Sequence, residues 1–79
     1  MASRKTIIQI FEEPVELYKI LKFENIAASG GEAKYLIQDG EVRVNGQVET
    51  RKRKKIMHGD VIEVFDQVLV VERAGERHS

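Results

Sequence analysis

The chain has 79 residues, enough for one small domain but not for the core that surrounds a deep catalytic cleft. Hydrophobic residues make up 42% of it and charged residues 33%, a balance typical of a folded rather than a disordered chain. With no cysteine, it forms no disulfide, thiolate metal site or thiol nucleophile. A small domain that lacks disulfides suits a reducing compartment, so we expect a cytoplasmic protein.

The charges are balanced in number but uneven in position. The 13 basic and 13 acidic residues give a formal net charge of zero, so the overall field does not predict nucleic-acid binding. Five consecutive basic residues, Arg51 to Lys55, form a segment that we call the basic run. From Lys34 to Lys55 there are seven basic and three acidic residues, which predicts a local basic patch.

The sequence has no segment with the pattern of a signal peptide or a membrane span. The apolar stretch at residues 6–11 is too short and interrupted for a signal peptide, so we do not expect secretion. The longest fully apolar run is Val68 to Val71, whereas a membrane span needs about 20 residues. We expect one domain over residues 1–79, with a core at about residues 6–71 and a flexible tail at residues 72–79.

The first half of the chain predicts a strand and a helix. Residues 5–11 are rich in isoleucine, which favours a half-buried strand. Pro14 suits the first turn of a helix, and we expect that helix over about residues 14–24. Its predicted apolar face consists of Leu17, Ile20 and Leu21, with Val15 and Tyr18 beside it.

A second helix of about ten residues is predicted from Ser29. Ser29 and Glu32 have the spacing of a capping box, in which the serine hydroxyl accepts from a helix N–H and the glutamate accepts from the serine N–H. Gly40 is a natural left-handed stop. The predicted buried positions are Ala33, Leu36 and Ile37, with Lys34 and Gln38 on the opposite side.

The remaining residues predict antiparallel strands. Valines alternate with charged residues over residues 41–44, and Asn45–Gly46 is a strong turn signal. A two-residue turn would place Val48 on the face of Arg43, whereas one extra loop residue would place it with the buried valines, and we favour this longer loop. A second hairpin is predicted from strands at residues 61–65 and 68–71 flanking Asp66–Gln67. The expected fold is α+β, with two helices packed on one face of a small antiparallel sheet.

Residues suited to catalysis or metal binding are scarce. Ser29 has no nearby base in the sequence and is expected to cap a helix. His58 with Asp60 and Glu63 matches no known metal-ligand spacing. Gly30–Gly31 lacks the nucleotide-binding glycine patterns and is expected to ease a tight helix entry or to let a ligand backbone approach. We therefore expect no enzyme activity, no metal and no cofactor.

The basic run has two interpretations. Most charge runs are solvated loops, and this one is expected to be flexible. The context favours a binding surface, because Lys34 follows a capped helix start and Arg43 lies on the polar face of the strand before the run. Together these cations suit the phosphates of a polyanion. Of the five aromatic residues only Tyr35 is expected near the patch, which favours folded RNA recognised by backbone and shape over stacked single strands.

The sequence also resembles a known family. Residues 29–46, SGGEAKYLIQDGEVRVNG, and residues 51–64, RKRKKIMHGDVIEV, resemble the S-four RNA-binding domain, named after ribosomal small-subunit protein four, over about residues 15–64. The family usually has a Ser-Arg pair where this chain has Ser29–Gly30, and a second arginine where it has Lys34. The dense basic run is similar to the stand-alone bacterial YbcJ-like branch, in which the run would compensate for the lost arginine.

The resemblance implies a non-catalytic module in which an L-shaped helix-and-strand element holds structured RNA, such as ribosomal or transfer RNA. We also expect the chain to be a monomer. The RNA-binding candidates that it implies are Lys34, Arg43, Arg51, Lys52, Arg53, Lys54 and Lys55. The residues expected to shape this surface are Ser29, Gly30, Asn45 and Gly46.

Two alternatives remain open. Residues 44–46 and 59–64 also resemble the β-grasp sulfur carriers, but those end in a free Gly-Gly that this sequence lacks, and two early helices fit their topology poorly. The other alternative keeps the S-four fold and makes the basic run a docking site for an acidic protein.

Overall fold

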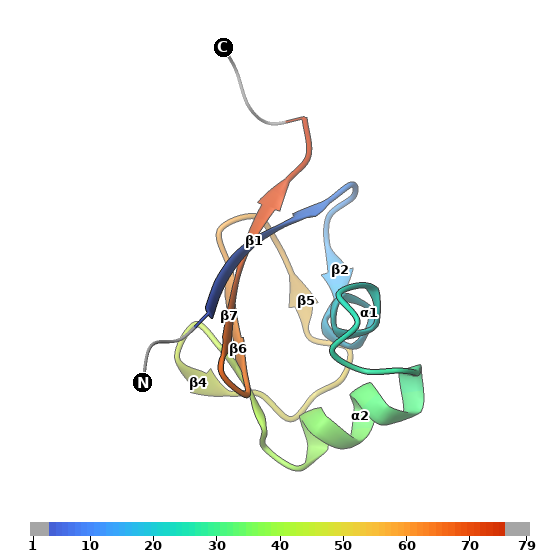
Figure 1. Cartoon of the computed structure of the whole chain (residues 1–79). Coiled ribbons are helices and arrows are strands. Elements are labelled where there is room, and N and C mark those ends of the chain that lie inside the picture. Colours follow the sequence, from blue (N-terminus) through green and yellow to red (C-terminus); the bar gives the residue numbers. More distant parts are fainter. Residues whose placement is uncertain (1–3, 76–79) are drawn as a thin grey trace.

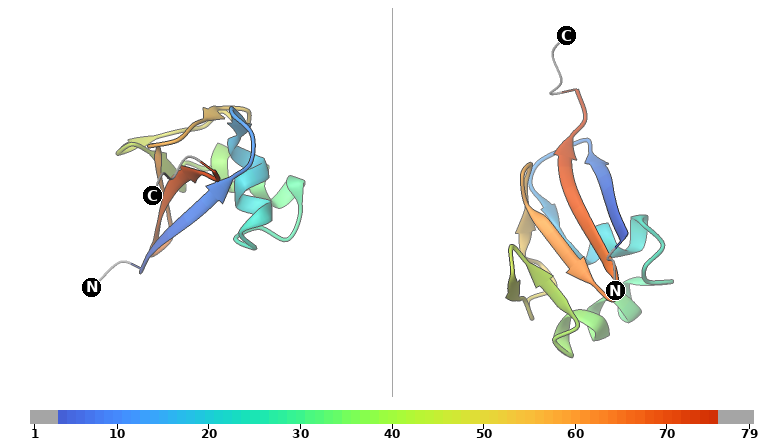
Figure 2. Two further views of the ribbon diagram at one scale, coloured as in Figure 1. Left: turned by 90° about the horizontal axis from the view of Figure 1, so that it is seen from above. Right: turned by 60° about the vertical axis from the view of Figure 1, so that its left-hand side comes forward.

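The computed structural model describes residues 4–75, in which two helices lie beside a sheet of strands (Figure 1). In chain order the elements are β1 (Arg4–Ile10), β2 (Val15–Glu16), α1 (Leu17–Phe23), α2 (Gly30–Gln38), β3 (Val42–Val44), β4 (Gln47–Val48), β5 (Lys55–Ile56), β6 (Val61–Val64) and β7 (Gln67–Arg73). Both helices lie on the same side of the main sheet, as the further views in Figure 2 also show. The predicted α+β class is confirmed.

The main sheet has the strand order β1-β7-β6-β3-β4, and β2 and β5 form a separate antiparallel pair. All neighbours in the main sheet are antiparallel except β1 and β7, which are parallel. The sheet is therefore mixed rather than wholly antiparallel as predicted. Parallel strands need a long connection, and here both helices and five short strands separate β1 from β7 in the chain.

The last strand extends beyond the predicted core. Glu72 and Arg73 belong to β7, and the N–H of Ala74 donates to the carbonyl of Ile10 at 2.8 Å. The first part of the predicted tail is thus paired with β1. Residues 76–79 lie outside the described residues.

The core lies between the sheet and the helices. Leu17, Leu21 and Ile37 have no exposed surface, as predicted for the helix faces, whereas Leu36 is only partly buried. Burying one such side chain contributes about 1.5–3 kcal/mol. The sheets add Ile8, Ile10, Val15, Val42, Val44, Ile56, Ile62, Val64, Leu69 and Val71 to the same cluster.

The first helix begins later than predicted. Instead of extending the helix to Pro14, Val15–Glu16 forms a strand paired with Lys55–Ile56. This pairing buries Val15 and satisfies the hydrogen-bonding groups of its backbone. The partner strand comes from a distant part of the chain, so local propensity does not reveal it.

The second helix follows its predicted signals. The Ser29 hydroxyl accepts from the N–H of Glu32 at 3.2 Å, and Gly40 has a left-handed φ of 80° after the last turn. The Glu32 carboxylate accepts from the N–H of Ala28, not from that of Ser29 as predicted. The extended backbone at Ser29 brings the preceding N–H within reach of this side chain.

The first hairpin has the shorter of the two predicted turns. Val44 pairs with Gln47 across the two residues Asn45 and Gly46, whose φ angles are both positive, as in the type I′ turns that match strand twist. Val48 is therefore on the face of Arg43 and is 52% exposed. Our preference for a longer loop was wrong, because turn geometry outweighs the burial of one valine.

The second hairpin turns one residue earlier than predicted. Val64 pairs with Gln67, so the turn is Phe65–Asp66. This register places Leu69 and Val71 in the core, and it leaves Phe65 exposed with a φ of 56°.

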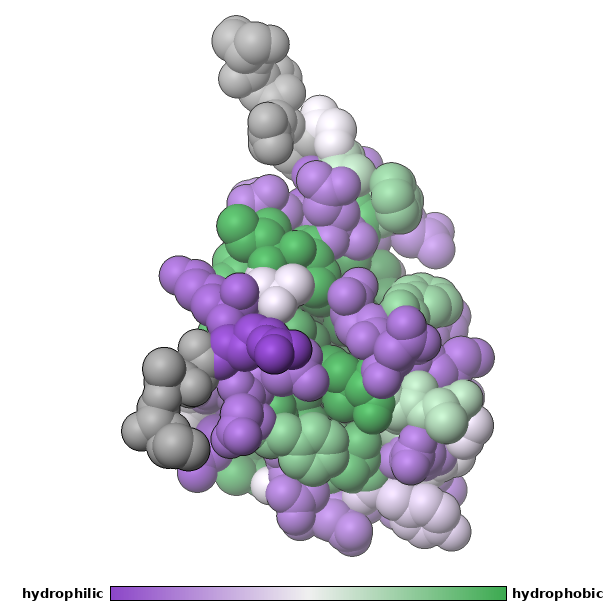
Figure 3. All heavy atoms as spheres, in the orientation of Figure 1, coloured by the Kyte–Doolittle hydropathy of each residue, from purple (hydrophilic) through white to green (hydrophobic). Residues whose placement is uncertain are grey.

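Hydrophobic side chains also reach the surface. On the face shown in Figure 3 they are open to solvent among hydrophilic ones. Within residues 4–75, no helix is long and apolar enough to cross a membrane.

Candidate nucleic-acid interface

The backbone of the basic run is tied to the start of α1. The N–H of Leu17 donates to the carbonyl of Lys54 at 2.9 Å, and the N–H of Tyr18 donates to the carbonyl of Lys52 at 3.0 Å. The first turn of a helix leaves N–H groups without intrahelical partners, and α1 has no side-chain cap. The run supplies the missing acceptors, so the expected flexible loop is instead fixed to α1.

The end of the run is anchored in the core. Lys55 pairs with Glu16 in the small sheet, and the next residue, Ile56, is completely buried. The N–H of Lys54 also donates to the carbonyl of Arg51 at 3.2 Å. The basic side chains therefore project from a backbone that is hydrogen-bonded both to itself and to neighbouring elements.

Tyr18 connects the basic run with α2. The ammonium of Lys52 lies 5.7 Å from the centre of the Tyr18 ring, within the range of a cation–π contact. The same ring is close to Gly30, where a Cβ atom would lie 3.9 Å from two ring carbons. Our expectation that only Tyr35 lies near the patch was wrong. Because α1 begins at Leu17, Tyr18 occupies its first turn beside the run.

The position of Gly30 is open to a side chain. A Cβ atom there would meet Tyr18 at 3.9 Å and Cδ of Lys22 at 4.0 Å, both ordinary van der Waals distances. Steric crowding therefore does not explain why this chain has Gly30 where the family usually has arginine. Lys22, from the last turn of α1, is a cation beside this position that the sequence analysis missed.

Arg51 is engaged by a neighbouring carboxylate. Its Nε and NH2 groups donate to the two oxygens of Glu49 at 2.9 and 3.3 Å, and its backbone N–H donates to Oε2 at 3.0 Å. These hydrogen bonds lower the pKa of Glu49, and the Glu49 carboxylate raises the pKa of Arg51. Arg51 is mostly exposed but is partly neutralised by this partner.

Arg43 lies on the outer face of the sheet among acidic residues. It pairs across strands with Glu63, and both line a shallow hollow together with Glu41. Within residues 4–75, no hydrogen bond or ion pair joins Arg43 to the basic run. Lys34 is exposed on α2, opposite the buried residues Ala33 and Ile37.

Asn45 and Asp60 join two turns at the ends of neighbouring strands. The Asn45 amide donates to Oδ1 of Asp60 at 3.1 Å and accepts from the N–H of Val61 at 2.9 Å. The other oxygen of Asp60 accepts from the N–H of Met57 at 2.8 Å. These contacts explain why an Asn-Gly turn and a later Gly-Asp pair occur together.

The residues considered for a metal have other partners. Asp60 is bonded as described above, and Nδ1 of His58 accepts from the N–H of Arg73 at 3.0 Å. The His58 N–H donates to Glu13 at 2.6 Å. Among residues 4–75 no cluster of three or more His, Asp or Glu side chains is arranged to hold a metal ion.

The comparisons with known proteins agree with this architecture. YbcJ of Escherichia coli (strain K12) is 50% identical over 48 residues, which cover 61% of this chain and 69% of YbcJ. The Bacillus subtilis (strain 168) protein named "Probable ribosome maturation protein RlbA" is 37% identical over 57 residues, 72% of this chain and 80% of that protein.

The fold is also that of a solved relative. The solution structure of E. coli YbcJ, which is described as revealing an αL motif involved in RNA binding, has a TM-score of 0.65 and 37% sequence identity to this chain. The match covers 84% of this chain and 85% of YbcJ. The family model described as "S4 domain" matches residues 8–72. The chain therefore belongs to the S4 domain family, as its resemblance predicted.

Proposed function

We propose that this chain is a non-catalytic module that binds structured RNA through the basic run and the adjoining start of α2. The observation that carries the proposal is the fixed backbone of the run, whose carbonyls at Lys52 and Lys54 cap α1. Cations on a rigid support lose less entropy on binding than cations on a free loop. The RNA-binding motif described for E. coli YbcJ supports this function.

The chemistry of the surface suits phosphate contacts. Lysine and arginine neutralise phosphates and release counterions, and arginine also binds a phosphate through two parallel hydrogen bonds. The first turn of α2, which Tyr18 connects to the run, adds the partial positive charge of a helix N-terminus, and the Glu32 carboxylate lies in the same turn. Lys34 extends this surface along α2.

The candidates differ in their expected contributions. Within residues 4–75, Lys52, Arg53 and Lys54 form no ion pair with a carboxylate, so they should contact phosphates most strongly. Arg51 is shared with Glu49, and Arg43 lies beside Glu41 and Glu63. We propose that these two arginines have secondary roles.

The target that we propose is ribosomal RNA, with transfer RNA as the other structured candidate. The B. subtilis relative is named for ribosome maturation, which favours the first. The surface consists of residues from one chain, so we propose a monomer that acts in the cytoplasm, where ribosomes are made. Membership in the S4 domain family favours this function over a β-grasp carrier.

A salt series tests the proposal. Binding of the protein to folded ribosomal RNA fragments is measured between low and physiological salt for the wild type and for a Lys52→Gln/Arg53→Gln variant. A matched control, Arg4→Gln/Lys5→Gln, removes the same charge from β1. Because each phosphate contact contributes about 0.7–0.9 to the slope of log affinity against log salt, we expect the first variant to lower the slope by about 1.4–1.8.

Either of two results would overturn the proposal. One is the absence of salt-dependent binding by the wild type, which would favour an acidic protein partner for the run. The other is an equal loss in both double variants, which would mean that overall charge and not this surface attracts RNA.

A further inference from the structure

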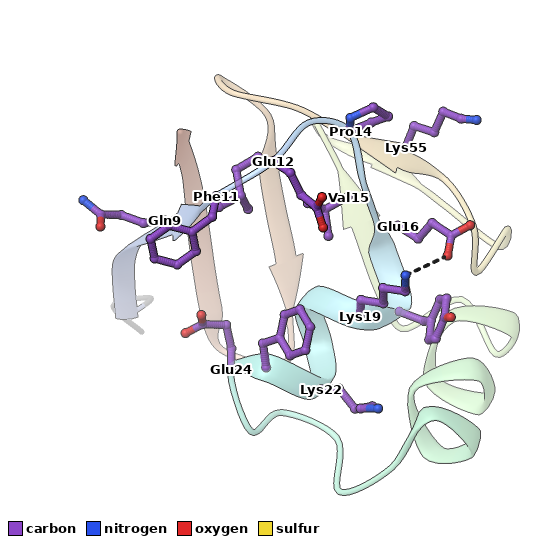
Figure 4. Close-up of a pocket in the computed structure, with 13 residues that line it drawn as sticks. Gln9, Phe11, Glu12, Pro14, Val15, Glu16, Lys19, Lys22, Glu24 and Lys55 are labelled. Carbon is purple, nitrogen blue, oxygen red and sulfur yellow. Dashed lines mark ion pairs between the residues drawn. The ribbon is translucent and has the colours of Figure 1, made fainter. Parts of the chain in front are cut away.

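A hollow lies between the end of β1 and α1 (Figure 4). Its volume of about 660 Å³ is within the range of small-ligand sites, about 300–1,000 Å³. Phe11, directly after β1, and Phe23, the last residue of α1, both line it. Their exposed fractions are 82% and 67%, so neither ring belongs to the core.

Exposed phenylalanines at one hollow indicate a binding surface. Scattered single hydrophobic residues on a surface need no explanation, whereas rings that share a concave site are candidates for ligand contact. Both rings are held by elements that pack into the core through Ile10 and Leu21. The hollow is therefore a formed feature of the fold.

Both signs of charge line this hollow, which includes Glu12, Glu16 and Glu24 as well as Lys19, Lys22 and Lys55. Phe11 and Glu24 lie on one side, and Lys22 and Lys55 lie on the other (Figure 4). Lys19 is on the lysine side as well, at 3.8 Å from Glu16.

The lysine side of the hollow continues into the surface proposed for RNA. Lys55 belongs to the basic run, and Tyr18, which also lines the hollow, contacts Lys52. A ligand in the hollow would therefore be next to a phosphate bound at the run.

We infer that the hollow binds one unpaired nucleotide of the RNA held at the basic run, with its base against Phe11 or Phe23. The inference rests on the proposed function and names the kind of RNA that the surface prefers. A nucleotide suits this lining, because its phosphate suits Lys22 and Lys55 and its uncharged base suits the phenyl rings. The carboxylate of Glu24 repels phosphate from the aromatic side, whereas Glu16 on the other side is paired with Lys19.

A neutral apolar peptide matches the hollow less well. It would cover the rings but offer no anion to Lys22 and Lys55. Base–aromatic stacking also tolerates any base, so the site requires an unpaired nucleotide rather than a particular sequence.

The first experiment compares two RNA hairpins that differ only by one bulged nucleotide. The wild type should bind the bulged hairpin at least about fivefold more tightly, the lower end of what stacking of one base contributes. A Phe11→Ala/Phe23→Ala variant should lose this preference while keeping the salt slope, because no phosphate contact is removed. Ile7→Ala, at an exposed position of β1 outside the hollow, is the control and should keep both.

The second experiment detects the stacked base directly. The chain has no tryptophan, so Phe23→Trp provides a single fluorescent reporter. Bulged RNA should quench this fluorescence more than paired RNA does. Phe65→Trp, in the exposed turn between β6 and β7, should respond equally to both hairpins.

The outcomes separate this inference from the proposed function. If the wild type binds both hairpins equally with a steep salt slope, and the reporter does not distinguish them, the inference is wrong and RNA binding stands. The hollow would then be a surface for a protein. If the wild type binds neither hairpin, the proposed function fails and the inference fails with it.

Discussion

The basic run and the outer face around Arg43 both carry positive charge, but their surroundings differ. The run is bonded through two of its carbonyls to the first turn of α1, and Lys52 contacts Tyr18. Arg43 projects from β3 on the face that also carries Glu63, with Glu41 in the same hollow. In the run one carboxylate, Glu49, engages Arg51, whereas Arg43 lies among two carboxylates on its face of the sheet.

This difference shows that a count of basic residues does not locate a phosphate-binding surface. Nearby carboxylates reduce the local potential at an arginine, and they compete with phosphate for its donors. A fixed backbone instead keeps several cations together on one surface. The structure therefore gives more weight to Lys52 than to Arg43, although the sequence placed both among the candidates.

Charge reversal should reveal the difference most clearly. We expect Lys52→Glu to weaken RNA binding by at least about tenfold, or about 1.4 kcal/mol, since it removes a phosphate contact and adds repulsion. Arg43→Glu makes the same change of charge and should cost less than about threefold. Affinities measured side by side at one salt concentration test the ranking, with thermal unfolding as the check on folding. Equal losses would show that Arg43 belongs to the main surface.

Adding a cation beside Tyr18 should strengthen binding. Gly30→Arg restores the family's usual Ser-Arg pair at a position with room for a side chain, so we expect an affinity gain of about three- to tenfold. The salt slope should steepen by about 0.7–0.9, as for one more phosphate contact.

Gly31→Arg is the matched control for this gain. A Cβ atom at Gly31 meets only the Ser29 hydroxyl, at 3.8 Å, and not Tyr18. Its net charge and helix composition equal those of the first variant. An equal gain from both would indicate that only overall charge matters.

Local signals in the sequence predicted the helices well. The Ser29–Glu32 spacing located the start of α2, and the spacing of Leu17 and Leu21 identified the buried face of α1. These features depend on residues three or four positions apart, which one sequence displays directly.

Features that depend on distant partners were not predictable in this way. Val15–Glu16 became a strand because Lys55–Ile56 pairs with it, about 40 residues later in the chain. The same contact places Tyr18 beside the basic run and makes Lys55 line the hollow with Phe11. The family resemblance supplied the overall fold, but the surroundings of each cation came only from the three-dimensional arrangement.

Removing the carboxylate that engages Arg51 should have a smaller effect. Glu49→Gln frees the Arg51 guanidinium for phosphate, so we expect RNA affinity to rise by about two- to threefold. In an Arg51→Gln background the same substitution should change affinity less, because its partner is gone. A gain of equal size in both backgrounds, measured as a double-mutant cycle, would contradict a role through Arg51.

The smallest expected effect is on stability in acid. Hydrogen bonds from Arg51 lower the pKa of Glu49 below its ordinary value of 4.5, so the folded state favours the ionised carboxylate. This contribution is fully present above pH 4.5 and is lost as the pH falls through the lowered pKa of the folded state. Denaturation midpoints of the wild type and Glu49→Gln should therefore differ slightly at neutral pH and converge as the pH falls below that lowered value. A difference in midpoint that persists undiminished at lower pH would show that Glu49 stabilises the fold through packing rather than through its charge.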